Sequence, residues 1–75
     1  MNRLYAYATP AGTFYICQIT GCYFGMFENR LIDSYATAEH AARRIAANRQ
    51  LSLPAGIKFD DLGIPANLTE WEEVE

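Results

Sequence analysis

The chain has 75 residues, of which 51% are hydrophobic, 13% aromatic and 20% charged, and its formal net charge is -3. This length allows one domain, the aromatic content excludes intrinsic disorder, and five glycines and three prolines exclude a collagen-like or low-complexity chain. No apolar run approaches the roughly 18 residues of a membrane helix, and the N-terminus has no signal-peptide pattern, so we expect a small cytoplasmic domain.

Four segments within residues 1–36 have the composition of short β-strands. They are rich in aromatic and β-branched residues and are separated by turn signals such as Pro10 to Gly12 and Thr20-Gly21. The expected strands are residues 4–8, 13–19, 22–27 and 31–35. Because the connections are short, the sequence predicts a three- or four-stranded antiparallel meander.

Residues 37–49 have the pattern of one amphipathic helix. Apolar side chains recur with helical spacing at Ala38, Ala41, Ala42, Ile45 and Ala46. Thr37 is a suitable N-cap, and Glu39 places a negative charge in the first turn, where it suits the helix dipole. Because the apolar face is mostly alanine, we expect the helix to approach its sheet closely.

Residues 50–75 combine large apolar side chains with interrupting glycines and prolines, which predicts an extended segment that wraps the domain. Within it, residues 69–72 match a capping box with Thr69 as the cap, which predicts a short C-terminal helix held to the domain by Trp71. The expected fold class is therefore α+β. A meander packed by one helix is followed by the wrapping segment and the short helix, within a single domain over residues 1–75.

Both faces of the expected sheet are apolar or aromatic. If Thr20-Gly21 is a two-residue loop, Cys17 opposes Phe24. One face then carries Tyr15, Cys17, Ile19, Cys22, Phe24 and Met26, and the other carries Phe14, Ile16, Gln18, Tyr23 and Phe27. One helix can cover only one of them, so the second face must be covered by residues 51–75, by another subunit or by a ligand. In this register Cys17 and Cys22 are diagonal neighbours, which favours two free thiols over a disulfide.

Charge divides the chain into two parts. Residues 1–59 carry a net charge of +3, and residues 60–75 carry a net charge of -6. An acidic C-terminal segment of this kind is typical of an interaction tail and could present its carboxylates to a basic partner.

No set of side chains has the spacing of a catalytic or metal-binding motif. The one histidine, His40, lies beside Glu39 on the expected polar face of the helix, and one histidine with two cysteines falls short of a zinc site. Asp60 and Asp61 have no series of spaced oxygen ligands around them. We therefore expect no enzyme activity, no cofactor and no metal.

One stretch resembles part of a known family. Residues 33–43 read Asp-Ser-Tyr-Ala-Thr-Ala-Glu-His-Ala-Ala-Arg and, within 31–46, resemble the third-strand-to-helix part of AP2-type DNA-binding domains. The resemblance implies a three-stranded sheet backed by one helix. AP2-type domains line the exposed sheet with Arg and Trp, whereas this sheet offers Tyr, Phe, Cys and Met, so the DNA-binding residues do not carry over. As a whole, the chain is similar to small bacterial or phage α+β proteins.

The leading functional prediction is a non-enzymatic protein–protein interaction domain without membrane contact, either a homodimer or an inhibitor or adaptor of the phage type. The residues expected at its interface are Tyr15, Tyr23, Phe24, Phe27, Trp71, Glu72 and Glu73. The alternative is a weak nucleic-acid-binding module that uses the helix arginines Arg43, Arg44 and Arg49. Few basic residues lie near the strands, which argues against nucleic acid as the main partner.

Overall fold

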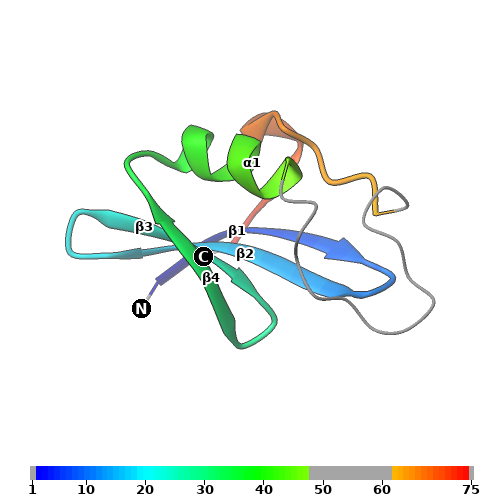
Figure 1. Ribbon diagram of the computed structural model, residues 1–75, viewed down its shortest axis with the longest axis horizontal. Coiled ribbons are helices and arrows are strands. Elements are labelled where there is room, and N and C mark those ends of the chain that lie inside the picture. Colours follow the sequence, from blue (N-terminus) through cyan, green and yellow to red (C-terminus); the bar gives the residue numbers. More distant parts are fainter. Residues whose placement is uncertain (1, 48–61, 75) are drawn as a thin grey trace.

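Figure 1 shows the computed structural model of the chain, which describes residues 2–47 and 62–74. The described strands form one antiparallel sheet in the order β4-β3-β2-β1-β5. They are β1 (Asn2–Thr9), β2 (Gly12–Ile19), β3 (Cys22–Phe27), β4 (Arg30–Tyr35) and β5 (Glu72–Glu73). The first four strands confirm the predicted antiparallel meander, and the two-residue β5 is an addition that the sequence pattern did not indicate.

The turn between β2 and β3 sets the register of the sheet. Thr20 and Gly21 both have positive φ, 36° and 79°, the combination found in a two-residue type I′ hairpin turn. Ile19 consequently pairs with Cys22, and Cys17 pairs with Phe24. The predicted division of side chains between the two faces of the sheet is therefore confirmed.

The helix α1 (Ala38–Ala46) packs on one face of this sheet. Thr37 caps its N-terminus, where the Thr37 hydroxyl accepts a hydrogen bond from the His40 amide over 3.0 Å. The helix ends at Ala46, with Ala47 as its C-cap, rather than at the predicted residue 49; the next sequence positions on its buried stripe, 48 and 49, carry Asn and Arg. Residues 48 and 49 lie outside the described part of the chain.

A glycine in the sheet lets α1 come close, as the alanine-rich helix face predicts. Gly25 is buried on β3, and a Cβ atom there would lie 2.9 Å from Ile45 Cδ1 and 3.0 Å from Tyr35 Cε2. The resulting core takes residues from the sheet, from α1 and from the C-terminal segment: Phe14, Ile16, Phe27, Ala38, Ala41, Ala42, Ile45, Leu62 and Trp71.

The described C-terminal segment, residues 62–74, covers the same face of the sheet as α1 (Figure 1). It contains the short 3-10 helix η2 (Leu68–Glu70), which is capped by Asn67, whose side chain accepts from the Thr69 amide over 3.1 Å. The predicted capping box with Thr69 as cap was therefore wrong. Asn67 satisfies the free amide one turn earlier, and the chain leaves η2 to add β5 beside β1.

This placement bears on one of the alternatives that the sequence left open, the covering of the second face by residues 51–75, but only for residues 62–74. The tail that contains Trp71 does not shield the second face of the sheet, because Trp71 and Leu62 are buried against the helix side. The part of the wrapping segment before residue 62 lies outside the description.

Candidate functional site

A groove lies on the helix side of the sheet, between α1, η2 and β5. Its larger hollow has a volume of about 450 Å³ and is lined by Tyr5, Glu39, Leu68, Thr69, Trp71 and Glu73. A second hollow of about 390 Å³ is lined by Glu39, Arg43, Ala66, Asn67 and Leu68. The two hollows share Glu39 and Leu68, so they form one continuous surface, which we call the C-terminal groove.

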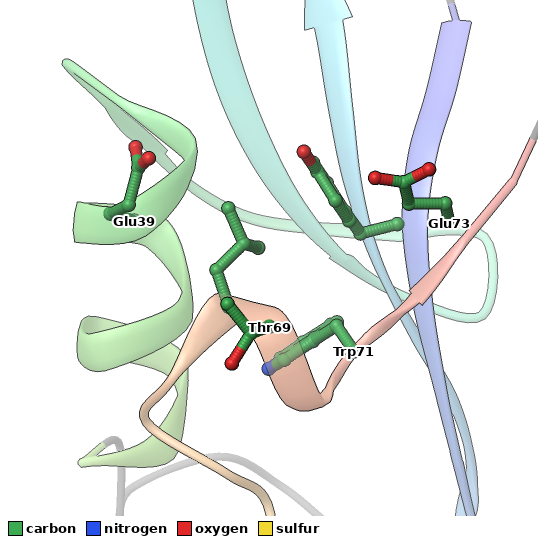
Figure 2. A pocket seen from close by; sticks show the side chains of 6 residues that line it. Glu39, Thr69, Trp71 and Glu73 are labelled. Atoms are coloured by element: carbon green, nitrogen blue, oxygen red, sulfur yellow. The ribbon is translucent and has the colours of Figure 1, made fainter.

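Four elements, α1, β1, η2 and β5, position the side chains of the C-terminal groove. Glu39 is the second residue of α1 and lies in its first turn, next to Ala38, which follows the Thr37 cap. The pairing of Glu73 with Tyr5 places Glu73 on the helix side of the sheet, while Glu72 pairs with Ala6 and lies on the other side. Figure 2 shows Glu39 and Glu73 on opposite sides of the hollow, with Thr69 and Trp71 between them.

The Trp71 ring is held firmly in the wall of the groove. Its indole N–H donates a hydrogen bond to the Pro65 carbonyl oxygen over 2.9 Å, so the polar edge of the ring is already satisfied. The Tyr7 ring packs against it with 5.9 Å between ring centroids. Only 4% of Trp71 is exposed, so the ring is a fixed part of the wall of the groove.

The charges of the C-terminal groove are separated along its length. Glu39 and Glu73 flank the larger hollow, and within the described part of the chain neither carboxylate has an ion-pair partner. Arg43 lines the second hollow at the other end. Glu39 lines this hollow too, so the groove offers two carboxylates beside aromatic and aliphatic walls at one end, and one carboxylate with one guanidinium at the other.

A second surface lies on the opposite side of the sheet. We call it the open face, because none of the described elements packs on it. The register and the strand alternation place on it Arg3, Ala6, Tyr15, Cys17, Ile19, Cys22, Phe24, Met26, Leu31 and Glu72. Ile19 is 41% exposed and Leu31 is 60% exposed, so large apolar side chains of this face reach solvent.

Arg3 lies across the open face. Its guanidinium stacks 4.3 Å from the centroid of the Tyr15 ring, and its Nη2 donates to Asn29 Oδ1 over 3.4 Å. Burial raises the pKa of the Cys17 thiol beside it, and the positive charge of Arg3 opposes that rise. Cys17 is buried and Cys22 is exposed, and both are free thiols as the register predicts.

The structure separates the residues that the sequence grouped into one interface. Tyr15, Phe24 and Glu72 lie on the open face, and Glu73 lies in the C-terminal groove. Tyr23 is half-buried against the core on the helix side. Phe27 and Trp71 are only 5% and 4% exposed, because both pack into the core, although Trp71 also lines the C-terminal groove; their place at an interface stays a prediction.

Two of the three helix arginines predicted for nucleic-acid binding lie in the described part of the chain. Arg43 and Arg44 are exposed on the last turns of α1, and Arg49 lies outside the described residues. Glu39 precedes Arg43 by one helical turn and lines the same hollow, so it offsets part of that positive charge. Glu73 of the acidic C-terminal segment lies on the same side of the sheet, which disfavours a phosphate backbone there.

Sequence reasoning missed three important residues. Glu39 was assigned only to the helix dipole, and Tyr5 only to a strand. Both line the groove because β5 pairs with β1 and brings the C-terminal segment beside them. The local sequence contains no signal that predicts a two-residue strand. Leu31 could have been found by extending the β2–β3 register across the next turn, because it pairs with Met26.

Comparison of the chain with protein-family models, curated proteins and solved structures gave no match. The resemblance of residues 31–46 to AP2-type domains stays a prediction. Within residues 2–47 and 62–74, no group of three or more His, Cys, Asp and Glu side chains is placed to hold a metal ion. A bilayer-crossing helix needs more length and more apolar character than any helix in those residues has.

Proposed function

We propose that the chain is a non-enzymatic protein-interaction domain that takes up a lysine or arginine side chain of a partner protein in the C-terminal groove. The observation that carries this proposal is the pair of carboxylates, Glu39 and Glu73, on opposite sides of a hollow whose wall is a fixed indole ring. Neither carboxylate is neutralised by a described side chain.

The chemistry of the hollow suits both parts of a basic side chain. Lysine and arginine carry an aliphatic stem and a charged head, and they bury the stem along apolar surface. Leu68 and the rings of Tyr5 and Trp71 provide that surface. Glu39 and Glu73 can receive the charged head, and hydrogen bonds to ionised groups are stronger than those between neutral groups. An aromatic ring also attracts a cation placed over its face.

The position of Arg43 favours one arrangement of charges in the partner segment. It lines the second hollow together with Glu39, so a basic group of the partner gains less there than between the two carboxylates of the larger hollow, and an acidic group can pair with the Arg43 guanidinium. A partner segment with a basic residue followed or preceded by an acidic one therefore fits the groove better than a wholly basic segment. We expect weak affinity for one isolated side chain, because Glu39 and Glu73 are both solvent-exposed.

The chain contains its own reporter for this binding. Trp71 is the only tryptophan, so intrinsic tryptophan fluorescence reads the wall of the groove directly. Titration of the full chain with an acetylated, amidated peptide that contains one Arg and one Asp should give a saturable fluorescence change. A peptide in which citrulline replaces Arg keeps the shape but not the charge, and it should bind more weakly.

Two variants test whether the groove is responsible. Glu73→Gln should weaken peptide binding about two- to fivefold, the range of one exposed ion pair. Glu70→Gln is the matched control, because Glu70 is an exposed carboxylate of the same segment and is absent from both linings. Equal binding of the arginine and citrulline peptides, or equal effects of the two variants, would contradict the proposal.

A further inference from the structure

The open face has the composition of a buried surface. Tyr15, Phe24 and Met26 are half-buried at its centre, and Ile19 and Leu31 extend the apolar surface to neighbouring strands. Both described covering layers, α1 and residues 62–74, lie on the other side of the sheet. Contiguous apolar patches on soluble proteins commonly mark sites of protein interaction.

The size of the open face suits a small protein interface. With strands about 4.8 Å apart and a rise of about 3.3 Å per residue, four strands of six residues span a patch of roughly 20 × 20 Å. Side-chain relief makes the accessible area larger than this outline. Two such outlines amount to roughly 800 Å², and with the added relief the buried area falls in the range below about 1,200 Å² that is typical of weak, reversible association.

The charges of the open face complement those of a second copy. The register places one cation, Arg3, and one carboxylate, Glu72, on the described part of this face. A two-fold axis that lies between two facing sheets, midway between these residues, brings Arg3 of each copy opposite Glu72 of the other. A self-complementary patch is what an isologous dimer requires. A wholly acidic or wholly basic face would instead repel its copy.

We infer that a second copy of this chain covers the open face, and that two chains pack sheet against sheet as a symmetric dimer. The C-terminal groove of each chain lies on the far side of its sheet, so the dimer presents two grooves that face away from each other. This consequence rests on the proposed function: two grooves on one particle would bridge two basic segments. The dimer itself rests only on the open face.

Sedimentation equilibrium of the full chain tests the dimer without any ligand. The chain should shift reversibly from monomer to dimer as its concentration rises. Leu31→Lys should raise the dimer dissociation constant at least about tenfold, because the interface would then bury a charge at two symmetric positions. The matched control is Ala47→Lys, which adds the same charge at an exposed position at the end of α1. A strict monomer at every concentration, or equal effects of the two variants, would overturn the inference.

A charge exchange tests the arrangement of the two chains. Arg3→Glu and Glu72→Arg should each raise the dissociation constant about two- to fivefold, and the double variant should recover part of that loss. Losses that simply multiply in the double variant would overturn the Arg3–Glu72 pairing. Circular dichroism verifies the fold of each variant, and Ile19→Lys provides a second, independent disruption of the face. Peptide titration of Leu31→Lys separates the proposals, because a monomer that still binds the arginine peptide retains the groove function.

Discussion

The two faces of the sheet start from the same kind of sequence and end in different environments. Along β2 and β3, aromatic and aliphatic residues alternate so that each face receives a similar set. On the helix side Phe14 and Ile16 are completely buried; on the open face Cys17 is also buried, but Ile19 and Leu31 are 41% and 60% exposed. Strand alternation therefore decides which face a side chain joins, and the covering elements decide what that face does.

The helix side is closed because small residues let its cover approach. Ala41 and Ala42 face the sheet, and Gly25 gives Ile45 the space that a Cβ atom would occupy. Trp71 then completes the core from the C-terminal segment. The open face has no comparable small-residue platform at its centre, where Tyr15, Phe24 and Met26 stand instead. Half-buried aromatics of this size suit contact with another protein surface better than close packing of a helix.

Truncating one phenylalanine on each face should give the largest contrast. Phe14→Ala leaves a cavity in the core and should lower the free energy of unfolding by about 3–5 kcal/mol. Phe24→Ala on the half-buried open face should cost about 1 kcal/mol in dilute solution. Urea unfolding at low protein concentration measures both. Equal losses would show that the open face is part of the monomer core.

Filling the space at Gly25 should have an intermediate effect. The added methyl group of Gly25→Ala would contact Ile45 Cδ1, so the free energy of unfolding should fall by about 1–3 kcal/mol. Ile45→Val removes that Cδ1 atom and alone should cost about 0.5–1.5 kcal/mol. The double variant should lose less than the sum of the two. Strict additivity would mean that the helix does not approach the sheet at this point.

Alkaline pH should produce the smallest effect, and it acts on both faces. Burial raises the pKa of the Cys17 thiol on the open face, and burial with the nearby Asp33 charge raises the pKa of the Tyr35 hydroxyl on the helix side. The folded chain therefore holds these protons after the unfolded chain has released them. Stability is complete below the unfolded pKa values and should fall as the pH rises from about 8.5 toward and past 10.

The slope of that loss is limited by the number of protons involved, to about 1.4 kcal/mol per pH unit for each group. Chemical unfolding between pH 7 and pH 10 measures it. Cys17→Ala should flatten the first part of the decline, and Cys22→Ala is the matched control because that thiol is exposed. A decline that survives Cys17→Ala unchanged would assign the effect to other groups.

Local signals predicted the parts of the fold that local chemistry determines. Thr20-Gly21 fixed the register through its positive φ angles, and Thr37 marked the start of α1. The C-terminal segment was less predictable, because Asn67 and Thr69 are both good caps and only tertiary packing selects Asn67. That packing also adds β5 to β1, which brings Glu73 opposite Glu39 to form the groove. Such a site, made from residues distant in sequence, leaves no motif.

The amide correlation spectrum of the labelled full chain tests most directly whether the two faces have separate roles. Dilution should shift the resonances of open-face residues in β2 and β3, and the arginine peptide should shift those of Thr69, Glu73 and the Trp71 indole N–H. Each perturbation should leave the other face unchanged. Shifts from both experiments on the same face, or no response of the Trp71 indole to the peptide, would contradict this division of the molecule.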